Sequence, residues 1–235
     1  MLRTSKPTAT GSAGTLTVPA IMRQRRAWRG HTPQCRDVDR LLRKYPETTM
    51  MAISRQGVHT LNLLAVEALF GHAGEPLVTL DGDMESNSEN YLEDGSMKAP
   101  QDCQPLRIPC FEGMKLFLTK NVDKDRDYVN GMRATVESFH RASKALYVIT
   151  DSQHRLAIRP WTDVSLGNRT YCPIRFGYAS TVIKMAGAEL PHAILWLDRP
   201  HVPGAAYTGM SRVAYGSNLL LGGNLSPEHF TPARL

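Results

Sequence analysis

The amino-acid sequence predicts an α/β fold, in which helices flank a parallel sheet and a small all-β unit is inserted. Three observations predict this fold. A short apolar run, a loop and a helical stretch follow one another at 48–70, which is typical of a strand–loop–helix unit. Short strand candidates then lie close together at 106–161, which suggests a small β-barrel. An apolar run at 193–197 and a helical stretch at 203–213 mark the return of α/β character.

The expected elements follow a simple order. After a tail at 1–30 come a helix from Thr32-Pro33 to Tyr45-Pro46, a strand at 48–53, a helix to Phe70, a short strand at 76–80 and an acidic loop at 81–104. Barrel strands are expected at 106–108, 114–118, 134–139, 146–149 and 156–158, then a helix at 178–186, a strand at 193–197, a helix at 203–213 and a strand at 218–221. The expected parts are the tail at 1–30, the first part of the α/β domain at 31–102, the inserted barrel at 103–170 and the second part at 171–235.

Local chemistry supports the main boundaries. Thr32 can cap a helix, and Pro33 suits its first turn. The run at 48–53 has the composition of a strand buried on both faces. Apolar residues recur at spacings of three and four over 58–69, as on one face of a helix. Within the β-rich region, Val129-Asn130-Gly131 offers turn chemistry between two strands.

Length and composition place the chain among globular proteins. Its 235 residues are 42% hydrophobic and 21% charged, enough for one large domain with an insertion. No stretch approaches about 18 consecutive apolar residues, so we expect no spanning helix and no membrane partner. The four cysteines form no C-x-x-C pair, so we expect no metal site. Scattered thiols without a secretory segment suggest a reducing compartment, and we expect a nuclear or mitochondrial protein that is not secreted.

The net charge of +6 is distributed unevenly. Residues 1–45 carry ten Lys or Arg against two Asp, whereas 75–102 hold eight acids against Lys98 alone. The start of the chain has a composition that organelle-targeting segments share, but we favour an ordinary disordered basic tail at 1–30. In either case the tail would add sequence-independent affinity for phosphate.

Several catalytic patterns are missing from the sequence. It contains no G-x-x-x-x-G-K-[ST] and no Gly-Lys dipeptide, and no apolar strand candidate ends in Asp-Glu. Without these, the sequence as given cannot hold the β- and γ-phosphates and Mg²⁺ in the P-loop manner by itself. The nucleophile elbow G-x-S-x-G and the zinc pattern H-E-x-x-H are missing too, which excludes two common hydrolase types.

Two segments in the second half of the chain contain residues that could form a functional site. Residues 178–190 are Y-A-S-T-V-I-K-M-A-G-A-E-L, and residues 207–213 are Y-T-G-M-S-R-V, with the apolar run A-I-L-W-L between them. The pair resembles motifs V and VI of superfamily-one helicases, specifically of the RecD/Pif-like branch.

Upstream segments support the same resemblance. Residues 53–62 look like the strand and helix of motif IV, with Asn62 in the place of its asparagine. Residues 111–121 look like the strand that enters the inserted barrel, and Val129-Asn130-Gly131 matches a V-N-G-T turn in which Met132 replaces Thr. The resemblance covers about 35–230 and implies a RecA-like parallel sheet with a Src-homology-three-like barrel inserted.

The resemblance implies the C-terminal part of an ATP-dependent DNA helicase that translocates 5′ to 3′ and unwinds DNA. Such motors bind ATP between two RecA-like domains and single-stranded nucleic acid across both. We therefore expect ATP and Mg²⁺ to bind only if another segment or chain supplies a P-loop domain. The expected partners are single-stranded DNA and that missing N-terminal RecA-like domain. Alone, the chain is expected neither to hydrolyse ATP efficiently nor to unwind DNA.

By resemblance, Arg212 is the arginine finger that reaches the γ-phosphate of ATP. A guanidinium is always protonated and donates in a fork, so it suits this task better than an ammonium. Thr181 and Lys184 would contact the nucleic-acid backbone, because a hydroxyl and an ammonium suit sequence-independent phosphate contacts.

Three further residues are candidates for contact with the nucleotide. Gly187 would allow close approach of the backbone, Glu189 would lie near the ribose or a neighbouring motif, and Arg55 would be a second phosphate contact. Plainer alternatives exist: an amphipathic helix ending in a glycine cap for 178–190, a surface arginine paired with a carboxylate for Arg212, and a solvated arginine for Arg55.

Two departures from the helicase pattern favour an alternative function. Ile183 stands where the family has His, and Ala186 where it has Gln. Neither replacement can donate a hydrogen bond, so the coupling of nucleic acid to nucleotide is in question. The alternative is a non-catalytic, helicase-derived module that binds nucleic acid or acts as an adaptor. A protein-interaction barrel is a third hypothesis, which rests on the β-rich middle alone.

Overall fold

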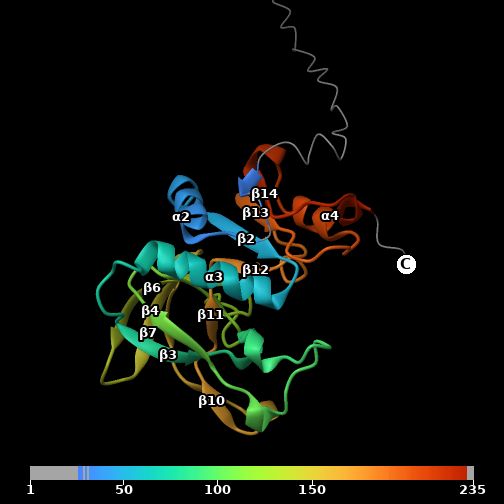
Figure 1. The fold of residues 1–235 in the computed structure, drawn as a ribbon. Helices are drawn as coiled ribbons and strands as arrows, with labels where there is room; N and C mark the ends of the chain where they lie inside the picture. Colours follow the sequence, from blue (N-terminus) through green and yellow to red (C-terminus); the bar gives the residue numbers. More distant parts are fainter. Residues whose placement is uncertain (1–25, 29, 31, 232–235) are drawn as a thin grey trace, which may run out of the picture.

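The computed structural model describes residues 26–28, 30 and 32–231 (Figure 1). Its centre is a five-stranded sheet in the order β1-β14-β13-β2-β12, and every pair in it is parallel. The strands are β1 (Arg26–Trp28), β2 (Thr48–Ala52), β12 (Ala179–Thr181), β13 (His192–Trp196) and β14 (Leu219–Gly222). The α/β class predicted from the sequence is confirmed.

Helices cover both faces of this sheet. They are α2 (Cys35–Lys44), α3 (Arg55–Phe70) and the short α4 (Ala205–Met210). Successive strand residues face opposite sides, so Met50 and Ala52 pack in the core shared with α2 and α3, while Met51 packs in the core shared with α4. Ile194 and Leu195 of β13 alternate in the same way. The central strands therefore carry apolar side chains on both faces, as a sheet covered on both sides requires.

Helix α3 is fixed to the edge strand β12, alongside which it lies in Figure 1. The side chain of Ser54 caps the helix by accepting a hydrogen bond from the backbone N–H of Gly57 at 2.9 Å. In the middle of the helix, the buried Asn62 accepts from the backbone N–H groups of Tyr178 and Ala179 at 3.2 and 2.9 Å, and donates to the Ala179 carbonyl at 3.3 Å. One amide thus ties α3 to the start of β12.

A second, antiparallel sheet holds the β-rich middle of the chain, in the order β11-β5-β6-β7-β8. Its strands are β5 (Lys115–Leu118), β6 (Arg133–His140), β7 (Ala145–Thr150), β8 (Arg155–Ile158) and β11 (Ile174–Phe176). Most of its buried apolar side chains join the same core cluster as those under α3, whereas Phe117 packs in the core beneath α4. These pairings do not confirm closure of the sheet into the predicted barrel.

Short elements complete the described structure. Two further strand pairs are β3 (Val78–Gly82) with β4 (Leu106–Cys110), and β9 (Trp161–Asp163) with β10 (Arg169–Tyr171). The 3₁₀ turns are η1 (Met84–Ser86), η2 (Ser88–Asn90), η3 (Pro100–Asp102), η4 (Val164–Leu166), η5 (Gly216–Asn218) and η6 (Pro227–Phe230). Within the described part of the chain, every helix is too short or too polar to cross a membrane.

The structure corrects the prediction of a helix at 178–186. Ala179–Thr181 form strand β12, which pairs with β2, because Asn62 and the β2 backbone satisfy the polar groups of this segment. The spacing of Val182 and Met185 that suggested a helix belongs to a single turn after the strand, in which the Met185 N–H donates to the Thr181 carbonyl at 3.2 Å. Both side chains are buried in the core beneath α4.

Two smaller corrections concern strands. The predicted tail at 1–30 is wrong at 26–28, where β1 pairs with β14 because Trp28 is buried edge-on against Trp196, with ring centroids 6.2 Å apart. Most of the remaining tail lies outside the described residues. The strand predicted at 106–108 exists as β4, but it pairs with β3 and not with the five-stranded sheet.

Candidate functional site

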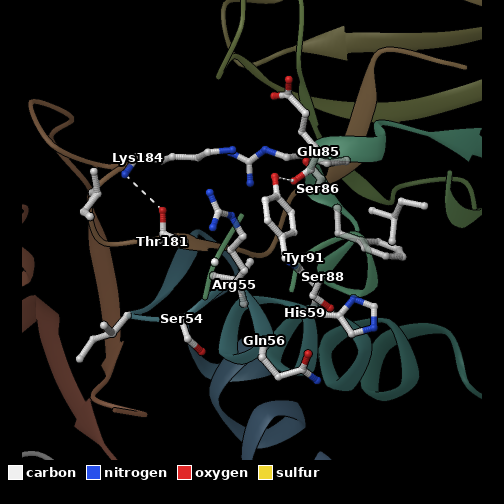
Figure 2. Close-up of a pocket in the computed structure, with 18 of the residues that line it drawn as sticks. Ser54, Arg55, Gln56, His59, Glu85, Ser86, Ser88, Tyr91, Thr181 and Lys184 are labelled. Carbon is white, nitrogen blue, oxygen red and sulfur yellow. Dashed lines mark hydrogen bonds between the residues drawn. The ribbon is translucent and has the colours of Figure 1, made fainter. Parts of the chain in front are cut away.

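A pocket of about 630 Å³ opens at the carboxyl ends of β2 and β12 (Figure 2). Open α/β sheets bind ligands at this edge, where the loops that follow parallel strands meet. Four positive side chains line the pocket, and we call it the cationic pocket: Arg55, Arg175, Lys184 and Arg199. Two carboxylates, Glu85 and Glu93, line it as well, so its formal charge is positive.

Thr181 and Lys184 lie on one wall of the cationic pocket. Thr181 ends β12, and its hydroxyl accepts a hydrogen bond from the backbone N–H of Lys184 at 3.3 Å. Desolvation lowers the pKa of Lys184, and the positive charge of Arg175 lowers it further, while Asp83 and Glu85 act in the opposite direction. The ammonium thus faces charges of both signs and forms no ion pair with a described residue.

Arg55 approaches the same pocket from the start of α3. Its guanidinium lies over the ring of Tyr91, 4.0 Å from the centroid, and Figure 2 shows the two side chains next to each other. The Tyr91 hydroxyl donates to the carbonyl of Glu85 at 2.9 Å, which fixes the ring. A cation over an aromatic face loses little of its charge to the contact, so Arg55 keeps its N–H donors for another group.

Asp198, which no sequence motif marked, holds the pocket's rim in place. This carboxylate follows β13 and accepts hydrogen bonds from the backbone N–H of Ile53 at 2.7 Å and from both the backbone and the hydroxyl of Ser54. Gly57 is required beside it, because a Cβ there would collide with the Asp198 carboxylate. Asp198 therefore positions the first turn of α3, including Arg55.

The sequence also gave no sign of Arg175, the one buried cation among the four that line the pocket. It lies in β11 directly before the segment that resembles motif V, and its guanidinium packs 4.4 Å from the centroid of the Phe117 ring. A charged residue between apolar neighbours in a short strand is the signal that could have marked it.

Arg212 lies in a different place, the turn after α4. The backbone N–H of Leu190 donates to the Arg212 carbonyl at 2.7 Å, so the two helicase-like segments are in contact. The half-buried guanidinium donates to the carbonyl of Thr208 at 3.1 Å, and to those of Met185 and Ala188 at 3.4 and 3.5 Å. It forms no ion pair with a carboxylate of the described residues.

Gly187 and Glu189 lie in the turn that Arg212 binds, and we call these three residues the Arg212 cluster. Gly187 has a φ of +86°, and nothing lies within 4 Å of the position of a Cβ. Both residues are exposed, and neither of the two described cavities is lined by any member of the cluster. These three residues therefore lie on a surface outside the cationic pocket.

The predicted site residues thus fall into two groups. Thr181 and Lys184, predicted for nucleic acid, share the cationic pocket with Arg55, which was predicted for the nucleotide. Gly187, Glu189 and Arg212 lie together outside it. Ile183 lines the pocket with 80% of its surface exposed. Among the residues that the structure describes, no three His, Cys, Asp or Glu side chains are grouped to hold a metal ion.

Solved structures share this fold, although no family model and no curated protein sequence matches the chain. Pif1 helicase from Candida albicans is 16% identical, with a TM-score of 0.59 over 85% of this chain and 51% of that chain. Pif1 helicase from Bacteroides, in complex with ADP-AlF3 and ssDNA, is 15% identical, with a TM-score of 0.56 over 88% of this chain and 52% of that chain. A Pif1 helicase at forked double-stranded DNA is 18% identical, with a TM-score of 0.55 over 84% and 45%.

These comparisons establish the fold. The chain has the RecA-like fold found in Pif1 helicases, as the resemblance to the RecD/Pif-like branch predicts. It spans about half the length of the solved helicases that it matches. The assignment to RecD, the missing N-terminal domain and the roles of individual residues stay predictions.

Proposed function

We propose that this chain is the C-terminal part of a Pif1-like DNA helicase and binds single-stranded DNA in the cationic pocket. One observation carries the proposal: Arg55 at the start of α3, and Thr181 and Lys184 at and just after the end of β12, meet at the carboxyl edge of a RecA-like sheet. A hydroxyl and several cations that form no ion pair with a described carboxylate suit the phosphates of a nucleic-acid backbone. The similar Bacteroides helicase was solved with ssDNA, which supports this choice of ligand.

In this proposal the Arg212 cluster belongs to the ATP site of the assembled motor. Another segment or chain would supply the P-loop and the Mg²⁺ carboxylate, and Gly187 and Glu189 would face the nucleotide. Arg212 would act as the arginine finger once it exchanges its two longest hydrogen bonds, to Met185 and Ala188, for phosphate oxygens. The 5′ to 3′ direction and a nuclear or mitochondrial location belong to the same proposal.

Fluorescence anisotropy with a labelled oligothymidylate tests the binding. We expect the chain to bind the single strand more tightly than a duplex of the same length, with an affinity that falls as salt rises because phosphate contacts release counterions. An ATPase assay with and without the oligonucleotide should show no efficient turnover by the chain alone. Absence of binding at low salt would refute the proposed function, and rapid turnover would refute the need for a second domain.

A second candidate function is a non-catalytic, helicase-derived module that binds nucleic acid or serves as an adaptor. It is favoured by the binding of the Arg212 guanidinium to the chain's own carbonyls, and by Ile183 and Ala186, both exposed and both unable to donate a hydrogen bond. A search of the adjacent reading frame for G-K-[ST] and Asp-Glu separates the two candidates. If such a segment exists, ATP hydrolysis by the joined protein that depends on Arg212 would support the motor.

A further inference from the structure

Arg175 is a buried positive charge that the fold leaves poorly satisfied. Only 7% of its surface is exposed, yet it lines the cationic pocket. Its guanidinium carries five N–H donors, and two of them make hydrogen bonds within the described structure, to the Ala179 carbonyl at 3.5 Å and the Ser180 hydroxyl at 3.3 Å. Both bonds are long, so most of the donor capacity is unused.

No carboxylate of the described residues forms an ion pair with Arg175. Asp83 acts on it only from a greater distance, and this buried carboxylate already accepts a hydrogen bond from the Ser86 hydroxyl at 2.6 Å. Burial lowers the pKa of Arg175 to about 10, so the group is still charged at neutral pH. A buried cation without a partner destabilises a fold, which makes a purely structural role for this charge hard to justify.

The surroundings of Arg175 are suited to a phosphate. It approaches Lys184 closely enough to lower the pKa of that ammonium, and the hydroxyl of Thr181 lines the same pocket. A guanidinium binds two oxygens of one phosphate in a fork, while an ammonium adds a point charge and a hydroxyl donates one more bond. The volume of about 630 Å³ has room for a nucleotide unit around that phosphate.

We infer that Arg175 is a phosphate-binding residue, which together with Lys184 and Thr181 holds one phosphodiester of the bound strand in the cationic pocket. The inference rests on the proposed function for the identity of the ligand. It assigns the contact to a residue outside the helicase-like motifs, and it explains why a short buried strand retains a charge between Ile174 and Phe176.

The test replaces Arg175 with methionine, which keeps much of its length and apolar contact with Phe117 but removes the charge. We expect Arg175→Met to bind labelled oligothymidylate about tenfold more weakly, with a salt slope smaller by about 0.7, since one phosphate contact is lost. Its melting temperature should equal or exceed that of the unmodified chain, because an unpaired buried charge has been removed. As a matched control, Arg155→Met removes an exposed arginine outside the pocket and should change the affinity less than twofold.

Three results would overturn the inference. These are unchanged affinity in Arg175→Met, failure of this variant to fold, or a melting temperature several degrees lower, since each indicates a structural role. Arg175→Lys adds a check, because it keeps the charge but not the fork and should bind with an intermediate affinity and an unchanged salt slope.

A second probe separates this inference from the proposed function. If the unmodified chain binds no oligonucleotide, the proposed function fails. A rise in melting temperature with inorganic pyrophosphate that Arg175→Met abolishes would then still support an anion site at Arg175. The absence of such a rise in the unmodified chain, together with the absence of oligonucleotide binding, would overturn both.

Discussion

Arg175 and Arg212 differ in how far the folded chain satisfies the hydrogen-bond donors of the guanidinium. The Arg212 guanidinium donates to the carbonyls of Thr208, Met185 and Ala188, and to the hydroxyl of Ser211. The Arg175 guanidinium is more deeply buried, but it makes two long hydrogen bonds and packs on a phenylalanine ring.

This difference indicates that Arg212 stabilises a turn, whereas Arg175 has donors left for a ligand. Hydrogen bonds to the last carbonyls of a turn stabilise the folded chain, so Arg212 has a structural role whatever its role toward ATP. A buried guanidinium with unused donors lowers the stability of the free protein. Binding of an anion to those donors would restore the lost stability. The two arginines should therefore respond in opposite ways to the same substitution.

The largest effect is expected for Arg212→Met. Loss of the hydrogen bonds to Thr208, Met185 and Ala188 should lower the free energy of unfolding by about 2 kcal/mol, because each of the three bonds contributes about 0.5–1.5 kcal/mol. Urea unfolding followed by circular dichroism measures this, while oligonucleotide affinity should stay within twofold. Unchanged stability would show that the contacts to the turn contribute nothing, and the contrast with Arg175 would disappear.

A moderate effect is expected for Lys184→Met. This substitution removes one charge from the cationic pocket and should weaken binding of single-stranded DNA about fivefold, with no loss of melting temperature, because the ammonium has no carboxylate partner in the described structure. Lys124→Met, at an exposed position outside the pocket, is the control for loss of one positive charge. Equal effects of the two substitutions would indicate that binding follows net charge alone.

The smallest effect is expected for Asp83→Asn, through its dependence on pH. Burial raises the pKa of Asp83 above the ordinary carboxyl range. Between the ordinary carboxyl pKa and the raised pKa of Asp83, the folded state binds more protons than the unfolded state. The contribution of Asp83 to stability therefore falls as pH rises through this range. The variant should therefore melt slightly higher than the unmodified chain near pH 7, and the advantage should vanish near pH 4.

The same measurement also tests whether Asp83 is the partner of Arg175. If Asp83 were the partner that satisfies Arg175, its neutralisation would lower the melting temperature at pH 7 and leave it unchanged at acid pH. That result would remove the argument that Arg175 needs a ligand.

Periodicity and local chemistry were sufficient to predict the α/β order of the chain. The apolar run at 48–53 and the helix to Phe70 match β2 and α3 closely, since both carry strong patterns. The helix expected at 178–186 was wrong, because its apolar spacing fits a single turn as well as a helix. The extended conformation is stabilised by hydrogen bonds to Asn62, more than a hundred residues earlier in the chain. The strand at 26–28 depends on pairing with β14, and no local sequence pattern predicts this pairing.

The candidate site shows the same division between local and long-range information. Resemblance to helicase motifs indicated Thr181, Lys184 and Arg55, and the structure brings these three into one pocket. Arg175 was missed because the sequence predicts no element at 174–176, and the three-residue strand β11 depends on its pairing with β5. In the structure β11 is covered on both sides, so all three residues are buried, and only the three-dimensional arrangement reveals that.

The amide of Asn62 has a consequence for how the pocket meets a ligand. Arg55 begins α3 and Thr181 ends β12, and the hydrogen bonds of Asn62 join these two elements directly. The groups that would grip a phosphate are thus preorganised before the strand arrives, so little conformational entropy is left to be lost on association. A loose collection of the same charges on flexible loops would have to order itself at every encounter.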